Sequence, residues 1–122
     1  MTLVIGGAGQ GKLEYVLSQL HVGKDEVSYD PEAAKAVVAG LETWLRGERE
    51  PMPVLERLLE DRPDVVILCN EVGSGVVPMD REERAWRERV GRTCCALAEQ
   101  AGCVIRMYCG IPSIIKGEPE WN

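Results

Sequence analysis

The residues best suited to chemistry lie in one glycine-rich loop near the start of the chain, Gly6-Gly7-Ala8-Gly9-Gln10-Gly11-Lys12. The loop follows an apolar run at residues 3 to 5 and precedes a helical pattern. In that setting the spacing G-x-x-x-x-G-K is typical of a phosphate-binding loop, or P-loop. Glycines let the backbone turn its N–H groups inward, so that several amides and a helix N-terminus face one anion. We therefore expect residues 6 to 13 to bind ATP or GTP, with Lys12 neutralising the β- and γ-phosphates as a catalytic residue.

One position of this loop departs from the usual pattern. A Ser or Thr normally follows the lysine, and its hydroxyl ligates Mg²⁺. The chain has Leu13 there, and a leucine has no lone pair to offer. We expect the loop to hold phosphate with a weakened share in Mg²⁺ coordination; a glycine-rich turn that binds nothing is the alternative.

A second candidate group follows the predicted strand at residues 64 to 69. After Asp64 this strand is an unbroken apolar run, which is typical of a strand covered on both faces in a parallel sheet. The chain continues as Asn70-Glu71-Val72-Gly73-Ser74-Gly75. Ligands of open α/β sheets bind outside the carboxyl ends of the strands, so Glu71 should emerge on the same edge as the phosphate loop. There it could hold Mg²⁺ or accept a proton from a substrate hydroxyl. Gly73, Ser74 and Gly75 would let the backbone approach the substrate. The alternative for Glu71 is a solvated loop side chain.

Strand-like and helical patterns alternate along the chain. Strands are predicted at residues 2 to 6, 26 to 29, 64 to 69 and 103 to 109. Helices are predicted from residue 12 to a stop near Gly23, and at residues 31 to 46, 54 to 59 and 80 to 101. This alternation predicts an α/β fold, a P-loop NTPase-like three-layer sandwich with a small, mostly parallel sheet of about four or five strands. Residues 1–122 should form a single nucleotide-binding domain. After the last strand we expect residues 110 to 112 to turn away and residues 117 to 122 to form a loose acidic tail.

The charge and the apolar runs of the chain bear on nucleic-acid binding, membrane insertion and localisation. Twenty acidic and fourteen basic residues give a net charge of -6, which repels nucleic-acid backbones, so we expect no nucleic-acid partner. The longest apolar runs are far shorter than the ~20 residues that span a bilayer. The chain begins directly with a strand pattern and lacks the charged and then apolar order of a signal sequence, so a cytoplasmic protein is expected.

The five cysteines are an odd number without a C-x-x-C pair, and the chain has one histidine. We expect reduced thiols that are mostly buried, and of the adjacent Cys94 and Cys95 at most one in the core. His21 ends the first predicted helix, where it could cap free carbonyls. Its other reading, as a nucleophile or base, lacks a partner at a suitable spacing.

Three stretches together resemble the bifunctional adenosylcobinamide kinase / adenosylcobinamide-phosphate guanylyltransferase family of cobalamin biosynthesis. Residues 4 to 12 resemble the family's GGARSGKS loop. Residues 70 to 78 are similar to its NEVGxGIVP motif nearly letter for letter, and Arg84, Arg87, Gly91 and Arg92 follow at the family's spacing. Gly110-Ile111-Pro112 and Lys116 resemble the family's closing GIPxxIK motif. Residues 40 to 45 are only weakly similar to its CLTLW segment.

The resemblance implies transfer of the γ-phosphate of a nucleoside triphosphate to the aminopropanol hydroxyl of adenosylcobinamide, a corrinoid. It also implies small ring-shaped homo-oligomers. The basic stretch that carries the family's guanylylated histidine has no counterpart here, which speaks against guanylyl transfer. Leu13 stands where the family has Ser, and Cys94-Cys95 stands where it has an Asn-Gln pair.

Two further readings belong to other classes. A catalytically degenerate paralogue that binds a nucleotide or an anion, with a regulatory or assembly role, would explain the loss of the loop hydroxyl. A dinucleotide-binding oxidoreductase does not fit, because Gly7, Gly9 and Gly11 lack the G-x-G-x-x-G interval.

Overall fold

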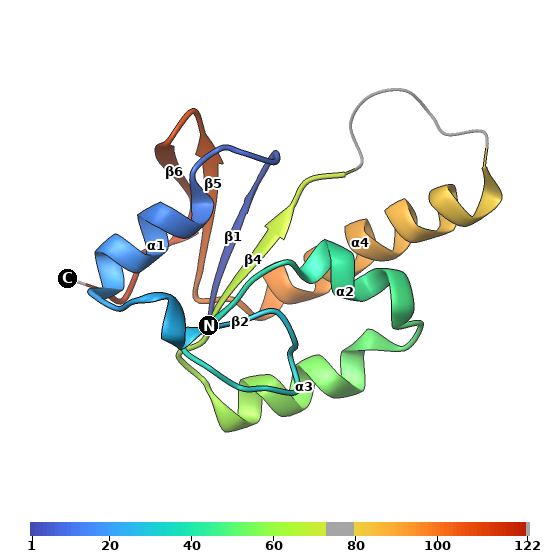
Figure 1. The fold of residues 1–122 in the computed structure, drawn as a ribbon, viewed down its shortest axis with the longest axis horizontal. Coiled ribbons are helices and arrows are strands. Elements are labelled where there is room, and N and C mark those ends of the chain that lie inside the picture. Colours follow the sequence, from blue (N-terminus) through green and yellow to red (C-terminus); the bar gives the residue numbers. More distant parts are fainter. Residues whose placement is uncertain (73–79, 122) are drawn as a thin grey trace.

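The computed structural model describes residues 1–72 and 80–121 (Figure 1). Its strands are β1 (Thr2–Gly6), β2 (Val27–Ser28), β3 (Val37–Val38), β4 (Val66–Asn70), β5 (Cys103–Tyr108) and β6 (Ile111–Gly117). Its helices are α1 (Lys12–Leu20), α2 (Leu41–Gly47), α3 (Pro51–Asp61) and α4 (Arg81–Gln100), with a short 3-10 turn, η1 (Lys24–Glu26). The expected substrate-binding residues Gly73, Ser74 and Gly75 lie outside the described residues.

The strands form one sheet in the order β2-β3-β4-β1-β5-β6. All neighbours are parallel except β5 and β6, which are antiparallel. The α/β class and the mostly parallel sheet are confirmed, but the predicted four or five strands are corrected to six in the part of the chain that is described. In the register, Gly6 lies opposite Asn70, so the carboxyl ends of β1 and β4 are level. The glycine loop and the segment that contains Glu71 therefore begin side by side.

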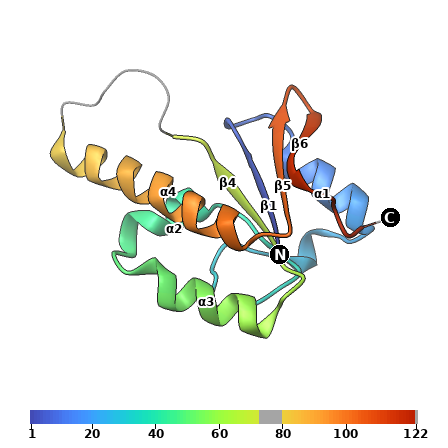
Figure 2. The same ribbon diagram turned by 180° about the vertical axis from the view of Figure 1, so that it is seen from behind.

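Helices cover both faces of the sheet (Figures 1 and 2). On one face, α1 packs through Val16 and Leu13 against strand residues that include Val4 and Leu68. The other face is covered by α2, α3 and α4, whose buried residues Leu41, Leu45, Leu55, Leu58, Trp86, Val90 and Leu97 share a cluster with Leu3 and Ile67. This is the three-layer arrangement that the alternating pattern predicts.

The predicted helix over residues 31 to 46 is wrong in its first half. Val37 and Val38 form the short interior strand β3, which pairs with β2 and β4, and both side chains are fully buried. Gly40 follows in a left-handed conformation with φ 67° and is the N-cap of α2. The apolar residues of this segment have helical spacing, but burial of β-branched side chains between two strands overrides that period.

The end of the chain also differs from the prediction. Cys109 and Gly110 both have positive φ and form a two-residue hairpin turn, so residues 111 to 117 return along β5 as the exposed edge strand β6. The tail is anchored, because Trp121 is 9% exposed and packs edge-to-face on Tyr15, with ring centroids 6.0 Å apart.

The long helix α4 follows the sequence prediction closely. The Asp80 carboxylate accepts a hydrogen bond from the Glu82 N–H at 2.9 Å and caps the helix. Cys94 is half-buried and Cys95 exposed, which confirms that at most one of the pair belongs to the core. All five cysteines are free, and two of them are fully buried. None of the helices in the described ranges combines the length and the apolar character needed to cross a membrane.

Candidate phosphate-binding site

The glycine loop connects β1 to α1 and depends on glycine at its first residue. Gly6 has φ 154°, and a Cβ atom there would lie 2.6 Å from the carbonyl oxygen of Met107 on β5. Gly9 and Gly11 have φ 73° and 87°, in the left-handed region that glycine adopts without strain. Gly11 is the N-cap of α1 and offers no side chain, so the free N–H groups of the first turn are open to an anion.

Lys12 turns its side chain back onto this loop. Its ammonium group donates hydrogen bonds to the carbonyl oxygens of Gly7, at 2.8 Å, and Gly6, at 3.2 Å. Only 8% of the residue is exposed. Burial lowers the pKa of Lys12 below its usual value, against the opposing field of carboxylates, of which Glu42 acts most strongly. The cation is thus held at the loop in a partly desolvated position.

Gln10 ties the loop to the turn between β5 and β6. Its side-chain carbonyl accepts a hydrogen bond from the Cys109 N–H at 2.6 Å, and its main-chain carbonyl accepts one from the Gly110 N–H at 3.0 Å. The closing Gly110-Ile111-Pro112 stretch, far away in the sequence, therefore adjoins the glycine loop. This contact gives the loop an anchor outside its own strand and helix.

A cavity of about 300 Å³ opens beside the loop. It is lined by Gly9, Gln10, Gly11, Lys12, Leu13, Glu14, Tyr29, Ala39, Gly40, Glu42, Leu68 and Asn70. Leu13 thus contributes an apolar side chain to this wall. A triphosphate that entered here would meet the loop amides and Lys12 on one side and the first turn of α2 on the other.

Glu42 is a charged residue of this cavity that the sequence analysis missed. Its Oε1 accepts a hydrogen bond from the Asn70 N–H at 2.8 Å, and its Oε2 accepts one from the Thr43 hydroxyl at 3.2 Å. Its main-chain carbonyl accepts a hydrogen bond from Trp86 Nε1 at 2.7 Å. A signal was present, because Glu42 lies two residues after Gly40 and shortly after the end of β3, but the predicted helix over residues 31 to 46 concealed that strand.

The backbone of Glu71 lies beside the glycine loop, but its side chain points away from the phosphate cavity. Its N–H donates to the Gly6 carbonyl at 2.8 Å. Its carboxylate makes two contacts of 3.0 Å with the Arg106 guanidinium on β5. It lines a second cavity of about 280 Å³, whose other lining residues are Ile5, Asn70, Val72, Arg87, Val90, Gly91 and Cys94. Lys12 and Glu71 thus share the predicted sheet edge and open into different cavities, which have Asn70 in common.

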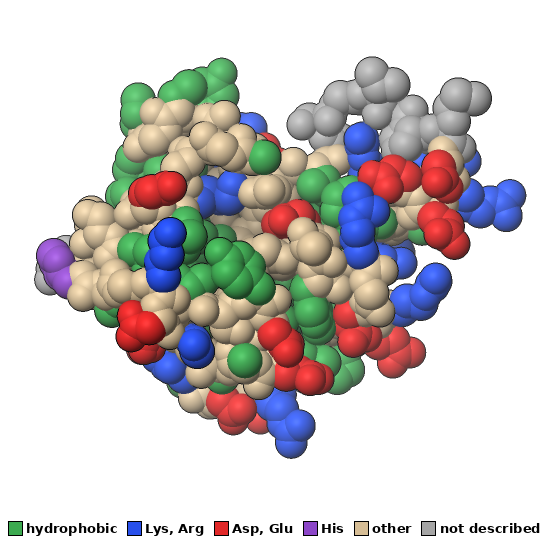
Figure 3. Space-filling view, in the orientation of Figure 1, with side chains coloured by type: hydrophobic (Ala, Val, Ile, Leu, Met, Phe, Trp, Pro, Cys, Tyr) green, Lys and Arg blue, Asp and Glu red, His purple; other side chains and the backbone are tan. Residues whose placement is uncertain are grey.

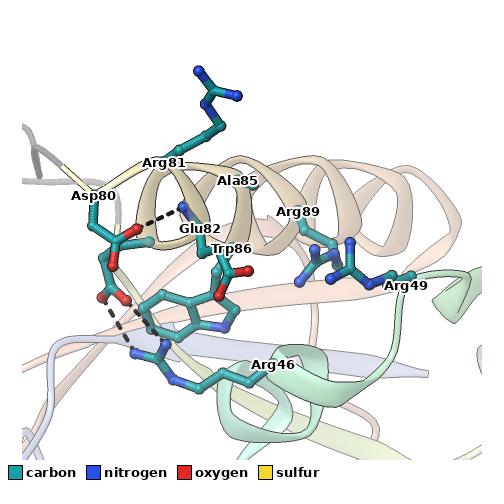
Figure 4. Close-up of a pocket in the computed structure, with 9 residues that line it drawn as sticks. Arg46, Arg49, Asp80, Arg81, Glu82, Ala85, Trp86 and Arg89 are labelled. Carbon is teal, nitrogen blue, oxygen red and sulfur yellow. Dashed lines mark hydrogen bonds and ion pairs between the residues drawn. The ribbon is translucent and has the colours of Figure 1, made fainter.

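A further cavity, between α2 and the start of α4, is rich in arginine (Figure 4). There the Arg46 guanidinium lies 3.6 Å from the centre of the Trp86 ring and forms two hydrogen bonds with Glu83. Arg89 donates to the Leu45 carbonyl at 2.7 Å. Figure 3 shows acidic and basic side chains interspersed over this end of the molecule. Arg46 and Arg89 therefore have partners that fix α2 against α4.

Residues 1–72 and 80–121 contain no group of three or more His, Cys, Asp or Glu side chains arranged to hold a metal ion. In nucleotide sites Mg²⁺ commonly takes most of its ligands from phosphate oxygens and water.

Comparison with known proteins places the chain in a family. The sequence model of the family described as cobinamide kinase / cobinamide phosphate guanyltransferase matches residues 35–115, which is more than half of the chain. The bifunctional adenosylcobalamin biosynthesis protein CobP of Pseudomonas aeruginosa is 37% identical over 75 residues, which cover 62% of this chain and 42% of that relative. The chain therefore matches less than half the length of this curated relative. The chain belongs to the cobinamide kinase / cobinamide phosphate guanyltransferase family.

Proposed function

We propose that this protein is a nucleoside-triphosphate-dependent kinase of cobalamin biosynthesis, which transfers the γ-phosphate of ATP or GTP to the aminopropanol hydroxyl of adenosylcobinamide. Membership of the family supports the class of substrate. The observation that carries the proposal is the position of Lys12, buried at the glycine loop and facing a cavity large enough for phosphates. Phosphoryl transfer asks mainly for positioning and charge neutralisation, which such a loop supplies.

The loop residues take the roles that their geometry favours. The N–H groups of Gly9, Gly11 and the first turn of α1 bind the β-phosphate. Lys12 exchanges the Gly6 and Gly7 carbonyls for phosphate oxygens, which are stronger acceptors because they are charged. Mg²⁺, when bound with the nucleotide, neutralises further charge on the phosphates.

We assign Glu71 to the cavity in which the acceptor hydroxyl of the substrate would bind. Its cavity is lined mainly by apolar side chains such as Ile5 and Val90, and it adjoins the phosphate cavity through Asn70. An acceptor hydroxyl entering from this side would have the carboxylate as its hydrogen-bond acceptor. Arg106 holds that carboxylate in place with two contacts. Of the two roles expected for Glu71, this placement supports the hydroxyl role more directly than metal binding.

We do not extend the proposal to guanylyl transfer. His21, the one histidine of the sequence, is exposed at the end of α1, whereas the glycine loop lies at the start of that helix. A covalent histidine intermediate would need the imidazole within reach of the bound phosphates.

A second candidate function is a degenerate paralogue that binds a nucleotide or an anion in a regulatory or assembly role. The specific observation that favours it is Leu13, which lines the phosphate cavity where a loop hydroxyl would be. Both candidates predict binding at the loop. They differ in whether the nucleotide is consumed.

The test is a calorimetric titration of ATP and GTP, first with Mg²⁺ and then with a chelator, followed by an assay with cobinamide. The kinase predicts tighter binding with the metal and nucleotide consumption that depends on cobinamide. The degenerate binder predicts indifference to both additions. Lys12→Ala should weaken binding in either case and serves as the control for the location of the site.

We also propose that the protein forms homo-oligomers through the hairpin of β5 and β6. Tyr108, Ile111, Ile114 and Ile115 are each more than half exposed, and Figure 3 shows apolar side chains gathered at this corner of the molecule. An unpaired edge strand with apolar side chains commonly marks an interface. Light scattering of the wild type and of Ile114→Lys tests this, because the variant should lower the mass only if this edge is used.

A further inference from the structure

We propose that Glu42 supplies the carboxylate through which this site holds Mg²⁺, in place of the missing loop hydroxyl. The inference rests on the proposed function, because the metal would arrive with the nucleotide. It assigns a role to a residue outside the glycine loop and outside the segment that contains Glu71.

The position of Glu42 suits a metal ligand. Glu42 lines the same cavity as Gly11, Lys12 and Leu13, in the first turn of α2. Glu42 and Lys12 therefore line the same cavity, the carboxylate from α2 and the ammonium group from the glycine loop. A divalent cation bound to phosphates at the loop would lie between an anionic and a cationic side chain.

Hydrogen bonds also orient the Glu42 carboxylate. The Asn70 N–H and the Thr43 hydroxyl use one lone pair each of Oε1 and Oε2, and the Trp86 indole N–H, which donates to the main-chain carbonyl of Glu42, fixes the residue against α4. A carboxylate has about four lone-pair sites, so acceptor capacity remains for a cation or for its water ligands. Hydrogen bonds from neighbouring residues to a ligating side chain orient metal ligands in this way in proteins.

The donor set fits the ion. Mg²⁺ in phosphate-transfer sites typically takes one or two carboxylates, and substrate phosphates and water complete its octahedron. One fixed carboxylate opposite the phosphate loop meets that requirement. Leu13, on the loop side of the same cavity, cannot contribute.

The other carboxylates near the loop are less suitable. Both oxygens of Glu71 contact Arg106, and the side chain lines the second cavity. Glu14 lines the phosphate cavity as well, but it is exposed on α1. A cation would have to hold this exposed side chain in one conformation, at a cost in side-chain entropy.

The experiment measures metal binding and does not depend on turnover. Mn²⁺ serves as the probe, and its electron paramagnetic resonance signal reports free Mn²⁺ in the presence of a non-hydrolysable ATP or GTP analogue. We expect Glu42→Gln to weaken Mn²⁺ binding in the ternary complex by about tenfold or more. Glu14→Gln, in the same cavity, should remain within about twofold of the wild type. The amide oxygen of Gln can still accept from the Asn70 N–H, so the variant should fold, which circular dichroism checks.

A second variant tests the exchange of ligands directly. Leu13→Ser in the Glu42→Gln background should restore part of the Mn²⁺ affinity, because the new hydroxyl occupies the usual metal-ligand position of the loop. If the wild-type protein binds no nucleotide analogue, the proposed function and this inference both fail. If it binds the analogue with Mn²⁺ and Glu42→Gln binds the metal equally well, only this inference is overturned. A loss of Mn²⁺ affinity in Glu71→Gln, with none in Glu42→Gln, would overturn this inference as well.

Discussion

The ammonium group of Lys12 lies 2.8 Å from the carbonyl oxygen of Gly7, so the cation rests on the loop that is expected to receive an anion. Two neutral carbonyls are modest partners for a buried charge, and a phosphate oxygen would be a stronger one. Because these are its hydrogen-bond partners, the charged form of Lys12 lowers the stability of the folded protein when no ligand is bound. Stability and ligand binding should therefore respond to substitutions that change this cost in stability or the contacts that hold the loop in place.

The buried position of Lys12 predicts a pH dependence of stability. Burial lowers the pKa of Lys12 in the folded protein below its usual value of 10.5. Between those two pKa values the unfolded chain binds more protons, so the contribution of Lys12 to the free energy of unfolding rises with pH. Urea unfolding of the wild type and of Lys12→Met at several alkaline pH values isolates the contribution of Lys12 to the free energy of unfolding. The difference between the two should grow in favour of the wild type as the pH approaches 10.5, and a constant difference would contradict the prediction.

The close approach of Gly6 to β5 predicts a large penalty for any side chain. Gly6→Ala would bring a Cβ atom within 2.6 Å of the Met107 carbonyl oxygen, with φ at 154°. We expect a loss of about 3 kcal/mol in the free energy of unfolding, because β1 or β5 must shift. Gly91 is the matched control, since it is exposed in the middle of α4 with open space around its Cβ position. Gly91→Ala should stabilise the protein by about 0.5–1 kcal/mol, and equal effects of the two variants would show that the packing at Gly6 is misjudged.

The side-chain contact of Gln10 predicts a smaller effect. Gln10→Ala removes the hydrogen bond to the Cys109 N–H, and we expect a loss of about 1 kcal/mol in unfolding free energy. Nucleotide binding should weaken as well, because the loop loses an anchor on the β5–β6 turn. Gln19→Ala, at an exposed position of α1, is the control and should leave both measurements nearly unchanged. Wild-type affinity in Gln10→Ala would mean that the main-chain contact to Gly110 is sufficient.

The pair of Glu71 and Arg106 predicts a separation of two kinetic effects. Arg106→Gln leaves the phosphate cavity intact but releases the carboxylate that we place beside the acceptor hydroxyl. The rate of phosphoryl transfer to cobinamide should fall, while the dissociation constant of the nucleotide should stay within about twofold of the wild type. Steady-state kinetics and calorimetry on the same preparations measure the two quantities. A parallel loss of nucleotide affinity would place Glu71 in the phosphate site itself.

The sequence was sufficient where the determinants of structure are local. The glycine loop follows from residue types that permit positive φ next to a helix start. The strand β4 follows from an unbroken apolar run, and α4 follows from the Asp80 cap and its apolar stripe. Each of these signals lies within a few residues of the element that it specifies.

The sequence was insufficient where pairing partners are distant. Val37 and Val38 become a strand only because residues 27, 28, 66 and 67 lie on either side of them. Every residue of the strand β6 is exposed, so no alternation of buried and exposed positions indicated it. Glu42 was missed with β3, because its place at the cavity depends on the start of α2.

Glu71 follows the carboxyl end of β4, as the sequence predicts, but its side chain lies on one particular face of the sheet. The position of a residue after a strand predicts the edge of the sheet and not the face. Side chains alternate along a strand, and Leu68 belongs to the cluster on the α1 face while Cys69 belongs to the opposite one. Counting two residues onward from Cys69 would have placed Glu71 on the side of α4, away from the phosphate loop.

The central claim is that the glycine loop binds the phosphates of a nucleoside triphosphate. Its most direct test is a titration of ¹⁵N-labelled protein with ATP and GTP in the presence of Mg²⁺, followed by amide chemical shifts. We predict that the largest changes fall on residues 7 to 12 and that Lys12→Ala abolishes them at the same ligand concentration. Unchanged amides in the loop, or changes confined to the arginine-rich cavity around Arg46 and Arg89, would contradict the account.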